Sequence, residues 1–346
     1  MVVREASVGA GTVPGMEPTP ATPAPDHPTD TAPTPLRART PSDIAAFVPL
    51  ALGFLPERSV VMVSIGQRGG MHARVDLPQE PDDVDDVVEA LLRPARRHGV
   101  DDVIVVVYDD DTTVADEAAW AVHEEFTAAG ITVREVMRVH DDHWYAVLPG
   151  APLAAYQGVP FALAEHRFTA QGVFDGRVTH ASREALRSTI APDAAAARAL
   201  GPDLAAATPL QAGAVRTLVR RRVEQGTTFS GPELASVALS LVAGERRDEA
   251  WVWLTRDRAR RAVDLWADAV RRLPDAHVAG PAAVLAFAAW LTGDGALAWC
   301  AVDRCHEVEP AHSLGRLVAQ LLDGATSPAS WEVVRHELGG TADPAA

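Results

Sequence analysis

Three consecutive carboxylates, Asp109, Asp110 and Asp111, are the residues whose type and spacing point most directly to chemistry. They follow the run 102–108, which is almost wholly apolar and predicts a buried strand. Ligand sites in open α/β sheets gather at the carboxyl ends of strands, and Mg²⁺ and Ca²⁺ bind carboxylate oxygens. The three residues are therefore a candidate ligand or metal site. The structural alternative is that Asp111 caps a helix that follows.

Two further groups contain residue types that bind metals. Residues 140–143 read His-Asp-Asp-His, but the sequence does not identify the third and fourth ligands that a site on this turn needs. A polar hairpin turn is the favoured interpretation. Cys300 and Cys305 are five residues apart on one predicted helix and face different directions, so a buried structural role is favoured for both. No metal is assigned, and the sequence does not identify a cofactor.

Tryptophan concentrates in the C-terminal part of the chain, where arginines also cluster along the predicted helices. Six of the eight tryptophans follow residue 250, and all 31 basic residues are arginines. Trp251, Arg256 and Arg260 are candidates for a groove that binds a protein or peptide partner. Core packing is the alternative for the tryptophan, and solvated helix faces are the alternative for the arginines. A third alternative is that the arginine-rich half docks on the aspartate-rich first half.

The first half of the chain predicts an α/β layered domain with a mixed sheet, because strand and helix patterns follow one another with short links. Apolar run 102–108 predicts a central strand covered on both faces by helices. Pro49 is expected to kink or shorten the helix that begins near Thr40. Strand patterns occupy residues 59–65, 72–77, 102–108, 131–139 and 143–148, and helix patterns occupy 41–52, 82–98 and 114–129.

The second half predicts an all-α domain, because the apolar period is helical from Thr208 onward. A pattern of small, large, small and proline residues recurs 36 residues later. This spacing is similar to the second helix of a tetratricopeptide-like pair. The pattern comprises Ala262, Trp266, Ala269 and Pro274, followed by Ala298, Val302, Cys305 and Pro310.

These patterns divide the chain into three predicted parts. Residues 1–36 are rich in Pro, Thr and Ala and predict a disordered tail, because such a segment buries too little apolar surface to fold. Residues 37–195 form the predicted α/β domain, and residues 205–340 form the predicted helical, repeat-like domain. The Ala-rich stretch 194–207 contains a Gly-Pro pair and is expected to be a linker.

Charge and hydropathy exclude several classes of protein. The formal net charge of the 346-residue chain is −16, which argues against nucleic-acid or anionic-membrane binding. The most apolar segment, 281–302, contains Asp294 between two glycines and is better explained by two helices of a soluble core than by a membrane span. We expect a cytoplasmic protein, and two cysteines suit a reducing compartment.

Four blocks of sequence resemble an actinobacterial family catalogued as a domain of unknown function. They are GFLP at 53–56, VVVY at 105–108, SRE at 182–184 and AWLTGDGALA at 289–298. The resemblance covers about residues 37–338 and implies a shared fold, but it implies no activity. Many members have a cysteine in the loop that is Pro-Gly-Ala-Pro at 149–152 here, so the resemblance carries no metal or redox role to this chain.

Two hypotheses for function remain open. The first is a binding or scaffold module that acts through its helical half. The second is an enzyme, or a sensor of a small molecule or metal, with its site at the carboxyl end of strand 102–108. The first is favoured because the sequence contains no recognisable catalytic constellation.

Overall fold

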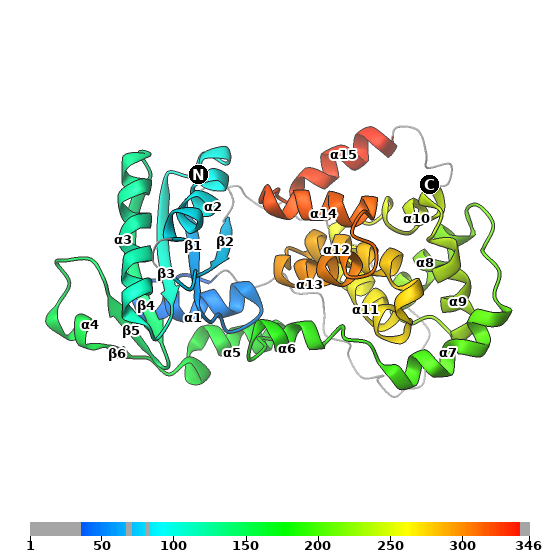
Figure 1. The fold of residues 1–346 in the computed structure, drawn as a ribbon, viewed down its shortest axis with the longest axis horizontal. Coiled ribbons are helices and arrows are strands. Elements are labelled where there is room, and N and C mark those ends of the chain that lie inside the picture. The colour runs from blue at the N-terminus through cyan, green and yellow to red at the C-terminus, as the bar shows by residue number, and fades with distance from the viewer. Residues whose placement is uncertain (1–35, 67–70, 81–82, 340–346) are drawn as a thin grey trace, which may run out of the picture. The chain divides into compact units, whose positions relative to one another are not determined.

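The sheet of the computed structural model has six strands in the order β2-β1-β3-β4-β5-β6 (Figure 1). Strands β3 and β4 pair in parallel, and the other neighbouring strands pair antiparallel, so the mixed sheet is confirmed. The structure describes residues 36–66, 71–80 and 83–339; the predicted tail, apart from Leu36, lies outside them. The strands are β1 (Ser59–Ile65), β2 (His72–Asp76), β3 (Asp102–Tyr108), β4 (Thr132–His140), β5 (His143–Ala146) and β6 (Val159–Pro160).

Strand β3 is central, as its apolar sequence predicts, because it lies between β1 and β4. Val103, Val105 and Val107 pack in one cluster with α2 (Val84–Arg97) and α3 (Thr112–Ala128). Val106 and Tyr108 point to the opposite face and pack in a cluster that contains residues of α1 (Pro41–Leu52). This alternation buries both faces of the strand.

Helix α1 continues past Pro49 to Leu52, so of the two expected effects of Pro49, shortening does not occur and kinking stays a prediction. Thr40 and Asp43 form a capping box at its start, in which each side chain binds the backbone of the other residue. Val48, Pro49 and Leu50 are all buried. Their packing offsets the backbone hydrogen bond that a proline removes from a helix.

Helices follow the sheet to the end of the described chain, as predicted, and the order α/β then all-α is confirmed (Figure 1). Helix α4 (Leu153–Gln157) lies between β5 and β6, and the helices that follow the sheet begin with α5 (Arg167–Phe174) and α6 (Arg183–Ser188). Helix α7 (Ala194–Ala206) contacts α9 and α11 and occupies the stretch expected to be a linker. The others are α8 (Ala214–Gln225), α9 (Gly231–Ser240), α10 (Gly244–Trp251), α11 (Arg256–Arg272), α12 (Ala279–Thr292), α13 (Gly295–His306), α14 (Ser313–Asp323) and α15 (Ala329–Gly339).

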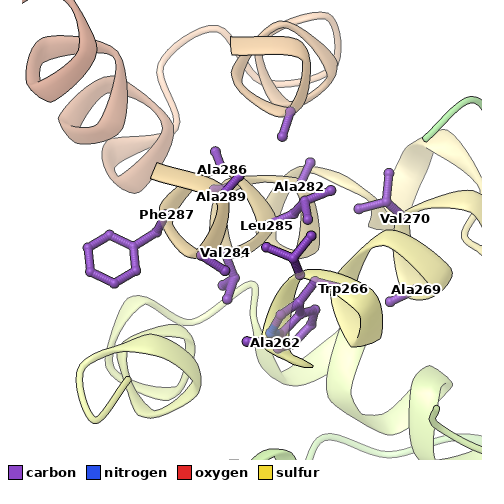
Figure 2. Packing of buried hydrophobic residues seen from close by; sticks show 14 of the residues in the cluster. Ala262, Trp266, Ala269, Val270, Ala282, Val284, Leu285, Ala286, Phe287 and Ala289 are labelled. Carbon is purple, nitrogen blue, oxygen red and sulfur yellow. The ribbon is translucent and has the colours of Figure 1, made fainter. Parts of the chain in front are cut away.

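The recurring small-large-small pattern lies on α11 and α13, and all six of its helical residues are buried. Both helices pack on the wholly apolar α12 that lies between them in the chain. Figure 2 shows Trp266 of α11 beside Ala262 and close to Leu285 of α12. Small residues at these positions allow the helix backbones to approach closely, which explains the recurrence.

The sheet half and the helical half have separate apolar clusters, with one overlap. Phe54, Leu186 and Ile190 precede residue 195 but pack in the cluster of the helical half. Residues from Leu36 onward form one compact unit. The division into domains 37–195 and 205–340 stays a prediction. Among the described residues, no helix is both long and apolar enough to cross a bilayer.

Candidate functional site

The loop after α1 pairs with the segment before α6. Gly53 ends α1 in the left-handed conformation, with φ of 78°. Phe54 and His180 form a parallel β-bridge. Leu55 N donates to His180 O at 2.9 Å, and His180 N donates to Gly53 O at 2.8 Å. The GFLP block is therefore held directly beside the SRE block.

The Gly-Asp-Gly turn of the fourth block begins α13, which packs on α6. Asp294 caps α13, because its Oδ1 accepts a hydrogen bond from Leu297 N at 2.9 Å. Burial raises the pKa of Asp294, while the hydrogen bond from Leu297 N and the charge of Arg260 partly oppose that rise. The first block is thus bridged to the segment before α6, and α6 in turn packs on α13, which the fourth block begins.

A cavity of about 390 Å³ opens beside this junction. Its wall is formed by the GFLP loop, β2, the start of α6 and the middle of α13. The apolar part comprises Phe54, Leu55 and Cys300, and the charged part contains three arginines and four acidic residues. The lining residues are Phe54, Leu55, Glu57, Arg74, Asp76, Ser182, Arg183, Glu184, Arg187, Cys300 and Asp303.

Arg74 forms the most buried charged part of the wall. Its guanidinium carbon lies 5.5 Å from the centre of the Phe54 ring, and Nη2 donates to Asp76 Oδ1 at 2.6 Å. Its Nε is buried and has no hydrogen-bond partner among the described residues. Burial lowers the pKa of Arg74, the ion pair with Asp76 opposes this, and the like charge of Arg183 adds to the lowering.

Arg183 is placed differently, because its charge is paired while its N–H groups donate no hydrogen bond to any described residue. Its Nη1 lies 3.7 Å from Asp76 Oδ2, and its Nη2 lies 3.6 Å from Asp303 Oδ2. Both distances are too long for a hydrogen bond. The side chain is 44% exposed. Ser182 starts α6 by accepting from Ala185 N at 3.1 Å, which fixes the position of Arg183 at the first turn.

Two possible nucleophiles in the wall are poorly suited to covalent chemistry. Burial raises the pKa of Cys300 to about 11, so this thiol stays protonated at neutral pH and is a weak nucleophile. The hydroxyl of Ser182 is engaged as the helix cap. Cys300 and Cys305 are both buried and free, which confirms the buried placement expected for them.

Asp109, Asp110 and Asp111 do lie at the carboxyl end of β3. Asp111 caps α3, since its Oδ1 accepts from Thr113 N at 2.8 Å. The Asp109 side chain is fully buried, and its Oδ1 accepts from Asp111 N at 3.1 Å. Its Oδ2 lies 3.8 Å from Arg58 Nη1 and accepts no hydrogen bond from the part of the chain that the structure describes. The ligand role of the three residues stays a prediction. In the described ranges, no three His, Cys, Asp or Glu side chains gather as a metal site would require.

The His-Asp-Asp-His segment forms the hairpin turn that the sequence favours. His140 ends β4 and pairs with His143, which begins β5. Asp141 between them has φ of 49°, a left-handed conformation that aspartate adopts more readily than most residues.

The structure places the three residues predicted to line a partner groove in two different environments, one buried and one exposed. Trp251 is only 8% exposed, and its ring packs on Phe287 and Trp331 at centroid distances of 4.6 and 5.4 Å. Arg256 and Arg260 are exposed on α11. Partner binding at these residues stays a prediction, and the buried indole offers a partner little surface in this conformation.

Sequence reasoning missed the charged residues of the cavity. Arg74, Arg183 and Asp303 lie in three distant segments, and no motif links them. The GFLP and SRE blocks, which contain residues of the cavity wall, were identified only through the family resemblance and not as candidate site residues.

A comparison with known families matches residues 41–329 to the model of a domain of unknown function, DUF4192. No curated protein and no solved structure matches the chain. The matched region contains every residue that lines the cavity. The chain belongs to the DUF4192 family.

Proposed function

We propose that this chain is a cytoplasmic binding protein whose ligand site is the cavity between the GFLP loop, β2, α6 and α13. One observation carries the proposal: two sequence blocks that are far apart in the chain, GFLP and SRE, meet at this cavity beside α13, the helix that the fourth block begins. Phe54 and Leu55 come from the first block and Ser182 to Glu184 from the third, and both line the cavity. The fourth block supplies Asp294, the cap of the helix that carries Asp303.

The helical half contributes directly to this site. Helix α13 places Cys300 and Asp303 in the wall. We therefore propose that the helical half acts by supplying part of the cavity wall. A peptide or protein partner would bind by inserting a small group into the cavity. The volume lies at the small end of the range for ligand pockets.

Binding is a better proposal than catalysis for this cavity. A catalytic centre needs a nucleophile or proton-transfer group that is free to act. Here the Cys300 thiol is protonated and the Ser182 hydroxyl caps a helix, so neither of these two groups is a ready nucleophile, and the carboxylates of the wall have no nucleophile to activate among them. The remaining polar groups are suited to orienting a charged ligand.

A thermal-shift screen tests the proposal. A ligand that binds only the folded chain must raise its Tm, so we would screen amino acids, carboxylic acids, nucleotides and sugars. We expect at least one class to raise the Tm of the wild type but not that of Leu55→Trp, which fills the cavity. Leu317→Trp is the matched control, because Leu317 is exposed on α14 outside the cavity. Stabilisation that survives in Leu55→Trp would place the ligand elsewhere and overturn the proposal.

A second candidate is a small-molecule sensor at the carboxyl end of β3. It is supported by the buried Asp109 Oδ2, which accepts no hydrogen bond among the described residues. A compound that stabilises the wild type and Leu55→Trp equally, but not Asp109→Asn, would favour this candidate.

A further inference from the structure

We infer that the ligand of the cavity is a free α-amino acid with an apolar side chain. This inference rests on the proposed function and specifies the chemistry of the same site. It follows from the spacing of Arg183 and Asp303, from the balance of charges in the wall and from the position of the apolar residues.

Arg183 is suited to bind a carboxylate. A guanidinium has five N–H donors in a planar fork that fits the two oxygens of a carboxylate. None of these donors makes a hydrogen bond to the described residues, although the side chain lies in the cavity wall. Asp76 does not meet this need, because its Oδ1 accepts from Arg74 at 2.6 Å while its Oδ2 lies 3.7 Å from Arg183.

Asp303 is suited to bind the ammonium group of the same ligand. Its Oδ2 lies 3.6 Å from Arg183 Nη2, and its side chain is 43% exposed. The carboxylate and ammonium of an α-amino acid are attached to one carbon atom. An acceptor and a donor placed side by side on the cavity wall can therefore receive both groups at once. The ligand would replace one long ion pair with two charge-assisted hydrogen bonds.

The charge of the wall favours a ligand that carries both signs. Arg74, Arg183 and Arg187 oppose Glu57, Asp76, Glu184 and Asp303. Arg187 is already bound to Glu307, outside the lining. A ligand with only negative charge would face this excess of acidic groups, and a ligand with only positive charge would leave the Arg183 fork unused. A zwitterion complements both.

The apolar residues then account for the side chain of the ligand. Phe54 and Leu55 form one wall of the cavity, and the neutral thiol of Cys300 lies among the charged groups of Arg183 and Asp303. Burying an aliphatic group against this surface is favourable, because it removes apolar area from water. We therefore expect L-leucine or L-methionine to bind more tightly than glycine or L-aspartate.

Three small molecules test the contributions of the ammonium group and the carboxylate separately. L-leucine carries both charges, 4-methylpentanoate lacks the ammonium group, and 3-methylbutylamine lacks the carboxylate. Isothermal titration calorimetry on the full chain should detect apolar amino acids, with the two half-ligands at least about tenfold weaker. Equal affinity for 4-methylpentanoate and the apolar amino acids would overturn the inference.

Variants test the two residues directly. Arg183→Gln and Asp303→Asn should each weaken amino-acid binding by about tenfold or more, since each removes one charged partner. Arg183→Lys, which keeps the charge but loses the fork, should also weaken it. Arg316→Gln is the control, because Arg316 is exposed on α14 outside the cavity. Unchanged affinity in Asp303→Asn would overturn the inference even if Arg183→Gln does not fold.

The outcomes distinguish this inference from the proposed function. If no amino acid binds but another compound stabilises the wild type and not Leu55→Trp, the cavity is a binding site and only the amino-acid inference fails. If no compound depends on the cavity, both fail.

Discussion

Phe54 and His180 pair as a parallel bridge that joins the loop after α1 to the segment before α6. The Phe54 ring packs in the apolar cluster of the helical half, while the guanidinium of Arg74 on β2 lies over it. One aromatic residue thus contacts the sheet, the bridge and the helices. The cavity beside it is defined by the same contacts that hold these segments together.

Asp43 should make the chain sensitive to acid. Burial opposes ionisation of this carboxylate, but hydrogen bonds from Arg39 N, the Arg167 guanidinium and Thr40 N hold its pKa at about 2, below 3.8. A carboxylate whose pKa is lower in the folded than in the unfolded chain stabilises the fold when the pH is above its pKa in the unfolded chain. This stabilisation is lost as the pH falls through its pKa in the folded chain. The shift corresponds to about 2 kcal/mol.

Urea unfolding from pH 5 to pH 2 measures this effect. Wild type should be more stable than Asp43→Asn at pH 5, and the difference should shrink towards pH 2. Asp85→Asn is the control, because Asp85 is exposed in the first turn of α2. A difference that does not depend on pH would show that the charge of Asp43 is unimportant.

Sequence patterns predicted the helices and strands well where the residue types strongly favour one kind of secondary structure or a helix cap. The apolar run at β3 and the capping residues Thr40 and Asp111 led to correct strand and helix positions. The Ala-rich α7 was missed because Pro202 suggests a break, whereas packing against α9 and α11 maintains the helix.

The cavity could not be predicted in the same way. Arg74, Arg183 and Asp303 come together only through the Phe54–His180 bridge and the packing of α6 on α13. Hydrophobic periodicity carries no information about which distant surface residues meet. The blocks around Phe54 and Ser182 were visible in the sequence, but nothing in one sequence shows that they are neighbours.

His312 should add a second pH dependence near neutrality. Its Nδ1 accepts a buried hydrogen bond from Gly315 N at 3.2 Å and caps α14, which requires that nitrogen to be unprotonated. Burial lowers the pKa of His312 below 6.5; Glu309 opposes this, and Arg247 and His306 add to it. The unfolded chain therefore takes up the proton first, so stability is full above about pH 7 and falls as pH drops below 6.5.

The variant His312→Asn isolates this effect, because asparagine can cap the helix and does not titrate. Unfolding free energies measured between pH 7.5 and pH 5.5 should fall less steeply in this variant than in the wild type. His336→Asn, at an exposed position on α15, should follow the wild type. Identical slopes for all three proteins would contradict the prediction.

Gly280 should be intolerant of a methyl group although it lies in a helix. A Cβ at this position would lie 2.9 Å from Leu241 Cβ and 3.5 Å from Leu241 O, so the end of α9 and the start of α12 would have to move apart. We expect Gly280→Ala to lower the free energy of unfolding by about 1–3 kcal/mol through overpacking. Gly244, in the first turn of α10, meets only Arg247 Nη2 at 3.8 Å.

The matched variant Gly244→Ala should have the opposite effect and stabilise the chain by about 0.4–1 kcal/mol. Chemical denaturation of both variants and the wild type measures whether each substitution raises or lowers the free energy of unfolding. Equal effects of the same sign would mean that backbone freedom, not contact with Leu241, decides the result at Gly280.

Trp251 and Arg256 should respond very differently to truncation, although the sequence placed them in one predicted groove. Trp251 packs on Phe287 and Trp331, and its Nε1 donates to Asp248 Oδ1 at 3.0 Å. Trp251→Ala should therefore lower the free energy of unfolding by about 3–5 kcal/mol. Arg256→Ala removes an exposed side chain from α11 and should change it by less than about 0.5 kcal/mol.

Urea denaturation of the two variants measures this contrast. A loss below about 1 kcal/mol in Trp251→Ala would mean that the indole is not part of the core. If Trp251→Ala is strongly destabilised and Arg256→Ala is not, only variants of the exposed arginines can be used to test partner binding in a folded chain. Because Arg256→Ala and Arg260→Ala leave the aromatic cluster intact, reduced binding of a partner by these folded variants would support the groove on α11, and unchanged binding would exclude these arginines from it.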